Sequence, residues 1–134
     1  MQDRFKFRVF IPDKKNSKNS LTGMFKVHSL HTGTNKAIIS SLYGNCSIKL
    51  ENNILMQCTG LKDKNGKLIY EGDIIDEGIK TVIEWDSERC ALVEKAKNIL
   101  GKEETYPLFD STNEGQNHRM EIIGNIYENP DLLQ

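Results

Sequence analysis

The sequence has few cysteines and no excess of charge of either sign. Its three cysteines, Cys46, Cys58 and Cys90, are odd in number and show no CxxC spacing, so the chain lacks the pattern of a disulfide framework. Lys and Arg total 18 against 19 for Asp and Glu. With a net charge of -1, the protein has no overall electrostatic attraction to nucleic acid or anionic lipid. We therefore expect reduced thiols in a cytoplasmic protein.

Long hydrophobic runs are also absent. The first residues, MQDRFKFRVFIPDKK, alternate charged and apolar side chains and contain no continuous apolar region of the kind that a secretory signal requires. No later segment is apolar for long enough to span a bilayer. We expect no membrane partner, and the formal glycosylation sequon Asn45-Cys46-Ser47 carries no meaning without secretion.

Phosphate-binding and metal-binding motifs are missing as well. Gly60, Gly66 and Gly72 are not accompanied by a GxxxxGK or GxGxxG pattern, and they are explained better as turn and bulge glycines. The acidic residues from 71 to 77 lack the loop spacing of an EF-hand. The sequence thus predicts no cofactor and no metal ion.

The length and the hydrophobic fraction of the chain are sufficient for a hydrophobic core. It has 134 residues, of which 37% are hydrophobic and 28% charged, and these values fit a single globular domain. Residues 5–11 alternate with Phe5, Phe7 and Val9 on one face, which predicts a half-buried strand that Pro12 ends.

The run LMQCTGLKDKNGKLIYEGDIID, from Leu55 to Asp76, predicts a hairpin. Asn65-Gly66 is typical of a two-residue mirror-image turn with positive φ at both residues. Thr59-Gly60 predicts a break in the preceding strand, and Gly72 predicts a bend of the kind that turns the corner of a small barrel. A second hairpin is expected from the strands Lys80–Trp85 and Cys90–Val93.

Other segments leave alternatives open. Ala37–Tyr43 fits a short helix almost as well as a strand, and Ala96–Leu100 fits one helical turn. Tyr106–Phe109 could pair only at a sheet edge because Pro107 lacks an N–H donor. Met120–Tyr127 predicts a last strand with a bend at Gly124.

The hairpin tip gives the candidate binding residues. Lys62, Lys64, Asn65 and Lys67 surround the turn, where lysines could contact phosphate groups. No aromatic residue is interleaved for base stacking and Asp63 offsets one charge, so a solvated tip is the simpler interpretation.

Candidate catalytic groups have weaker support. Glu71, Asp73, Asp76 and Glu77 could bind a hard cation, but such clusters usually coat a solvated bend. His28 and His31 should point to opposite faces of a strand. Each of the three cysteines lies in an apolar, strand-like setting, which predicts a buried core thiol.

Three segments, in this order, resemble the YopX protein family of phages and prophages: LMQCTGLKDKNGKLIYEGDII, VIEWDSE and EIIGNIYENPDLL. The N-terminal FKFRVF also resembles the opening strand of that family. The resemblance implies a mostly β, phage-derived protein in the cytoplasm of a bacterial host. The family has no established activity and no assigned site residues, so none are carried over.

We therefore expect a mainly β fold, or α+β with little helix. Residues 1–134 should form one domain, with a variable part (1–54) and a C-terminal part (55–134) that forms a small, bent SH3-like barrel or β-roll on which the N-terminal strand packs. The expected function is non-enzymatic binding or assembly as a homo-oligomer, with an unknown protein partner. The alternatives are nucleic-acid binding, in which Lys14, Lys15 and Lys18 would join the tip lysines, and a metal-dependent enzyme using Asp73 and Asp76.

Overall fold

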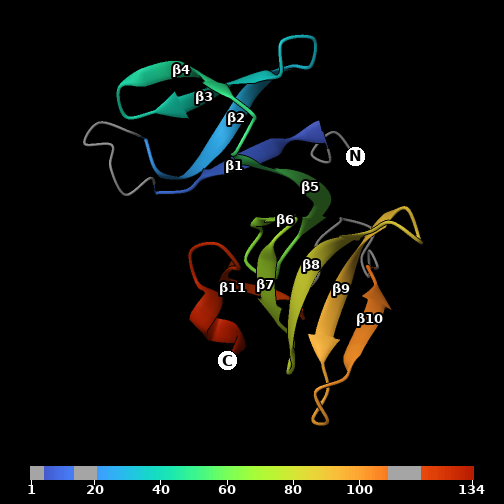
Figure 1. The fold of residues 1–134 in the computed structure, drawn as a ribbon. Coiled ribbons are helices and arrows are strands. Elements are labelled where there is room, and N and C mark those ends of the chain that lie inside the picture. Colours follow the sequence, from blue (N-terminus) through green and yellow to red (C-terminus); the bar gives the residue numbers. More distant parts are fainter. Residues whose placement is uncertain (1–4, 14–20, 109–118) are drawn as a thin grey trace. The chain divides into compact units, whose positions relative to one another are not determined.

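A computed structural model describes residues 5–13, 21–108 and 119–134 (Figure 1). Within these ranges the regular structure is β-strand, apart from the short 3-10 helix η2 (Pro130–Leu133). No helix in the described part combines the length and the apolarity needed to cross a bilayer. The prediction of a mainly β fold is confirmed.

The strands form two antiparallel sheets. One has the order β4 (Gly44–Lys49), β3 (Lys36–Ser41), β2 (Gly23–His31), β1 (Phe7–Ile11), β5 (Ile54–Lys62), β6 (Leu68–Tyr70). The other has the order β10 (Glu103–Pro107), β9 (Ala91–Lys97), β8 (Lys80–Asp86), β7 (Asp73–Asp76), β11 (Glu121–Asn125). Strands β10 and β11 are the two edges of the second sheet, and no closed barrel is found among the described residues. The SH3-like closure therefore stays a prediction.

The chain divides into two compact units, of which one comprises residues 6–57 and the other residues 1–5 and 58–134. We call them the N-terminal unit and the C-terminal unit. Each has its own hydrophobic core. The sequence predicts one domain with a division near residue 54, and the single domain stays a prediction.

In the N-terminal unit, β1 to β4 lie side by side in sequence order, and β5 returns to pair with the free side of β1. Its core consists of Val9, Ile11 and Ile39, all of which are buried on alternate positions of their strands. The strands are β1 (Phe7–Ile11), β2 (Gly23–His31), β3 (Lys36–Ser41), β4 (Gly44–Lys49) and the first part of β5 (Ile54–Lys62).

The C-terminal unit contains the rest of β5 and all later strands. Its core is formed by Ile69, Ile75, Ile83 and Met120, each at most 1% exposed. The strands are β6 (Leu68–Tyr70), β7 (Asp73–Asp76), β8 (Lys80–Asp86), β9 (Ala91–Lys97), β10 (Glu103–Pro107) and β11 (Glu121–Asn125).

Strand β5 belongs to both units. Its residues 54–57 pair with β1, which confirms the opening strand, and its later residues pair with β6. The break predicted at Thr59-Gly60 is wrong: the strand continues through Gly60, which has a φ of 84°, with an irregular register between Cys58 and Lys62. A glycine in the left-handed region allows the strand to bend without ending.

The open alternatives resolve in favour of strands. Residues 36–41 are β3, because this segment pairs on both sides and buries Ala37 and Ile39 completely. The helical turn predicted for Ala96–Leu100 is wrong, since Ala96 lies inside β9 and the chain turns after it. Pro107 does lie on an edge strand, as its missing N–H predicts.

Candidate functional site

The hairpin tip at Asn65-Gly66 has a different turn from the predicted one. Gly66 has a φ of 78°, whereas Asn65 is not in the left-handed region. The Gly66 N–H donates to the Asp63 carbonyl at 3.0 Å, and the Asp63 N–H donates to the Lys67 carbonyl at 2.8 Å. This is a three-residue loop, a type I turn followed by a G1 bulge. The hairpin was predicted correctly and its turn type was wrong.

The physical reason for the wider loop is the side chain of Asp63, which is fully buried. Its Oδ1 accepts hydrogen bonds from the backbone N–H groups of Asn65 and Lys67, both at 2.9 Å. Its Oδ2 accepts a bond from the N–H of Ile122 in β11 at 3.1 Å. The carboxylate therefore shapes the tip and fixes it against β11, so the tip is not a free surface loop.

The predicted lysines stay on this tip, but only some are available. Lys64 forms an ion pair with Glu121, with 2.9 Å between Nζ and Oε2, and that hydrogen bond raises the pKa of Lys64. Lys62, Asn65 and Lys67 are exposed. The structure brings the four residues together at one turn, while Glu121 offsets part of their charge. Lys14, Lys15 and Lys18 lie outside the described residues.

The carboxylates proposed for a metal-dependent enzyme have local structural tasks. Asp73 is 1% exposed and accepts a hydrogen bond from the Tyr70 N–H at 2.8 Å. Asp76 accepts one from the Gly78 N–H at 3.0 Å. In the ranges that the structure describes, no three His, Cys, Asp or Glu side chains gather as a metal site would require.

The cysteines and histidines are dispersed over both units. Cys58 is buried as predicted, and Cys46 is half-buried on an edge strand. Cys90 is exposed, and the prediction of a buried thiol was wrong there because the residue lies in the β8–β9 turn with a φ of 50°. His28 and His31 are both exposed.

A buried carboxyl group that the sequence did not indicate lies on β9. Glu94 is only 7% exposed, and its Oε1 accepts a hydrogen bond from the Thr81 hydroxyl at 3.0 Å. Burial raises the pKa of Glu94 to about 7, and the nearby Glu77 carboxylate acts in the same direction. The group therefore titrates near neutral pH.

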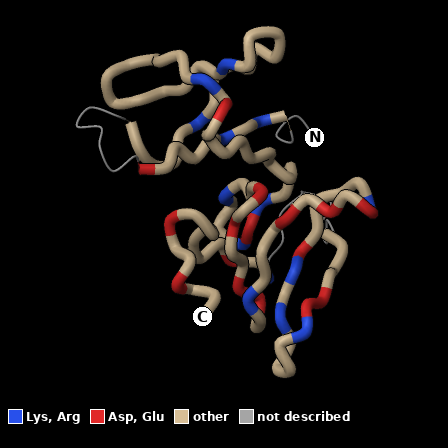
Figure 2. Tube along the Cα trace, viewed as in Figure 1, with Lys and Arg blue, Asp and Glu red and all other residues tan. Residues whose placement is uncertain are grey.

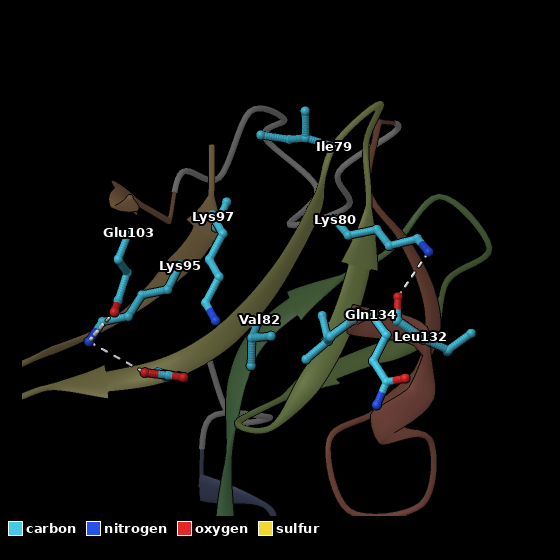
Figure 3. A pocket seen from close by; sticks show the side chains of 11 residues that line it. Ile79, Lys80, Val82, Lys95, Lys97, Glu103, Leu132 and Gln134 are labelled. Carbon is cyan, nitrogen blue, oxygen red and sulfur yellow. Dashed lines mark hydrogen bonds and ion pairs between the residues drawn. The ribbon is translucent and has the colours of Figure 1, made fainter. Parts of the chain in front are cut away.

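A pocket of about 470 Å³ lies in the C-terminal unit, bounded by β8, β9, β10 and the C-terminal η2 (Figure 3). Its apolar lining comes from Ile79, Val82, Ala96, Leu132 and Leu133. The volume is within the range of roughly 300–1,000 Å³ that ligand pockets occupy.

The charged lining of the pocket is largely paired. Lys95 lies 3.4 Å from both Glu84 and Glu103, and these carboxylates raise its pKa. Lys80 donates to the Leu132 carbonyl at 2.9 Å, which holds η2 against the strands. Lys97 also lines the pocket, and its side chain extends toward Val82 (Figure 3). Charges of both signs lie along the strands of this unit (Figure 2), but among its described residues 14 Asp and Glu outnumber 9 Lys and Arg, so the unit has a net negative charge.

The sequence model of a protein family, described as YopX protein, matches residues 6–134. The chain belongs to the YopX family. No curated protein matches it. Among solved structures, this YopX protein is similar to the crystal structure of protein EF1440 from Enterococcus faecalis, with 28% identity over 96% of this chain and 97% of that chain and a TM-score of 0.49.

The pocket of this YopX protein could not be read from the sequence. Its lining comes from three consecutive strands and from the C-terminal residues, which begin 29 residues after Glu103. One signal was present: the alternation Lys80, Val82, Glu84 places these side chains on one strand face. That alternation also describes an ordinary solvated face, and only the position of η2 turns it into a pocket.

Proposed function

We propose that this YopX protein is a non-enzymatic binding and assembly module that works as a homo-oligomer. The observation that carries the proposal is the tip of the β3–β4 hairpin, where Leu42 is fully exposed and Tyr43 is 91% exposed. Adjacent large apolar side chains projecting into water are typical of an interaction site, because burying them against a partner is favourable.

The strand that follows this tip supports the same proposal. Strand β4 is an edge of its sheet, and its sequence GNCSIK contains no proline to block further pairing. A second copy could bury the apolar tip and shield this edge in one contact. The occupant that we propose for this surface is therefore another chain of the same protein.

Light scattering during gel filtration tests the proposal. The unaltered chain should have the mass of several chains, and Leu42→Ser with Tyr43→Ser should shift it to the mass of one chain. Ile99→Ser with Leu100→Ser is the matched control, because these residues are also exposed at a hairpin tip. A one-chain mass for the unaltered protein at micromolar concentration would overturn the proposal.

Nucleic-acid binding is the alternative function. It is favoured by the exposure of Lys62 and Lys67 on a tip that the Asp63 carboxylate holds in place. Titration of labelled single- and double-stranded DNA at low salt tests it, with Lys62→Gln and Lys67→Gln as variants. Binding should weaken steeply with added salt, because each phosphate contact releases counterions. The absence of binding at low salt would remove the alternative.

The remaining expectations are proposals that derive from the family. We propose a phage-derived protein in the cytoplasm of a bacterial host, in which the bent sheet of the C-terminal unit serves as an SH3-like scaffold. Capture of partners from induced cells would identify a further protein partner. A metal-dependent enzyme has the least support, because Asp73 is buried and already hydrogen-bonded.

A further inference from the structure

The β3–β4 tip is held in a fixed shape by its own hydrogen bonds. The Ser41 hydroxyl donates to the Gly44 carbonyl at 2.8 Å, and the Tyr43 N–H donates to the Ser41 hydroxyl oxygen at 3.2 Å. Leu42 and Tyr43 are thus presented on a tip that is ordered before any contact forms. Such preorganisation lowers the entropy lost on binding.

The tip also carries no charge. From Ser40 to Asn45 the sequence is SSLYGN, without an acidic or basic residue. Burying this segment against another surface leaves no unpaired ion, and unpaired buried ions are what make many contacts unfavourable. The surface that binds an uncharged apolar tip should be an apolar pocket in which any charged side chains are already paired with groups of the same chain.

The pocket in the C-terminal unit has these properties. Its apolar side chains provide the hollow, while Lys95 is paired with two carboxylates and Lys80 with a backbone carbonyl. Lys97 is exposed, so its ammonium group can stay hydrated or donate to the hydroxyl of an inserted tyrosine.

The other exposed apolar tip is a poorer occupant. Ile99 and Leu100 are flanked by Lys97 and Lys102, and the strands beside them line the pocket. Inserting that tip would carry Lys97 and Lys102 to a pocket whose two carboxylates, Glu84 and Glu103, are already paired with Lys95.

We infer that the Leu42-Tyr43 tip of one copy inserts into the pocket of a second copy. This inference rests on the proposed homo-oligomer and specifies its contact. Because the tip and the pocket are different surfaces of the chain, the contact closes either by reciprocal exchange of tips in a two-fold dimer or by repetition around a ring, and without closure it continues as a filament.

A mixing experiment tests the inference. The tip variant is Leu42→Ser with Tyr43→Ser, and the pocket variant is Ile79→Lys with Leu133→Lys. The two pocket residues are 52% and 45% exposed, so charged replacements there are compatible with folding. Each variant alone should have a one-chain mass, and circular dichroism should show an unchanged β spectrum.

Mixed in equal amounts, the two variants should form a two-chain complex, in which the intact tip of the pocket variant occupies the intact pocket of the tip variant. The complex should grow no further, because only the altered tip and the altered pocket are left outside the contact. If the unaltered chain is oligomeric and the mixture stays at the one-chain mass, the inference is overturned while the proposed homo-oligomer stands. If the unaltered chain itself has a one-chain mass, both are overturned. If the Ile99→Ser, Leu100→Ser control also loses the oligomer, the choice of tip is wrong.

Discussion

At the scale of single residues, two buried carboxyl groups have contrasting surroundings. Asp63 accepts three backbone N–H donors, from Asn65, Lys67 and Ile122. Glu94 accepts one hydroxyl donor and faces another carboxylate. The first arrangement favours the charged form of the side chain and the second disfavours it.

We predict that Asp63→Ala destabilises the C-terminal unit by about 2–4 kcal/mol, because three backbone donors lose their acceptor in a buried position. Asp63→Asn should lower the free energy of unfolding by less, because the amide oxygen of asparagine can still accept some of these three N–H groups. Urea unfolding followed by fluorescence measures both. Asp76→Ala is the control, because Asp76 accepts the Gly78 N–H at an exposed turn. Equal effects at the two positions would contradict the role given to Asp63.

Glu94 makes the stability of the protein depend on pH. Its pKa rises from 4.5 to about 7 in the folded state, so between these values the native chain binds more protons than the unfolded chain. The stabilising effect of the protonated group is complete below about pH 4.5 and is lost as pH rises through 7.

Glu94→Gln should therefore raise the free energy of unfolding at pH 8 by about 2–3 kcal/mol and have little effect at pH 4.5. Glutamine stays neutral and can still accept the Thr81 hydroxyl. Urea unfolding at several pH values measures the difference. Identical pH profiles for the variant and the unaltered chain would show that Glu94 is not the titrating group.

The residue scale also shows what the sequence could predict. Gly66 and Gly72 were recognised from their backbone freedom, and both have positive φ. The role of Asp63 was missed because its Ile122 partner lies 59 residues later, and no local pattern reports such a contact. Glu94 was missed for the same reason, as its burial depends on neighbouring strands.

At the scale of elements, η2 packs closely against β11. A Cβ atom at Gly124 would lie 2.6 Å from Asn129 Oδ1 and 2.9 Å from Leu132 Cδ1. The same Asn129 oxygen accepts a hydrogen bond from the Asn125 N–H at 3.2 Å. Glycine at position 124 is thus required by a close approach of side chains.

We predict that Gly124→Ala costs about 1–2 kcal/mol, because the added methyl group displaces Asn129 and weakens its hydrogen bond. Gly33→Ala is the matched control, since an added Cβ there meets no atom within 4 Å. Thermal unfolding of the two variants measures the difference. A loss of stability at Gly33 as large as that at Gly124 would argue against the packing explanation.

Strands were predicted correctly where alternation of apolar and polar residues is bounded by turn-forming residues. The two hairpins and the last strand follow from such patterns in residues 54–97 and 121–125. Prediction failed for Ala96–Leu100, where an apolar pair at a hairpin tip resembles a helical turn. The sequence alone does not reveal that Ile99 and Leu100 are exposed.

At the scale of the whole molecule, the two hydrophobic cores form without shared residues. Ile39 belongs to one core and Ile83 to the other, and both are fully buried. Truncating either side chain removes packing in its own core alone.

We predict that Ile39→Ala, at a cost of about 2–5 kcal/mol, increases amide hydrogen exchange in residues 6–57 and leaves most of residues 58–134 protected. Ile83→Ala should give the reverse pattern. Mass spectrometry of exchanged peptides measures both. If each variant deprotects the whole chain equally, the two units unfold as the single domain that the sequence predicts.

The sequence thus predicted the mainly β character and the family, while the order of the strands and the pocket are visible only in the structure. Strand β6 follows β5 through the predicted hairpin, but the order β10-β9-β8-β7-β11 places the last strand beside β7. Pairing between segments so far apart in the chain leaves little trace in local patterns.

The bond between Asp63 and Ile122 has a consequence for synthesis on the ribosome. The hairpin that carries Asp63 emerges first, and its partner follows 59 residues later, which at typical elongation rates is roughly 3 to 12 seconds. During that interval the carboxylate must remain hydrated. The C-terminal unit can therefore close only after β11 has left the ribosome, and a ribosome stalled before Ile122 would hold a nascent chain with an open hairpin, accessible to proteases and chaperones.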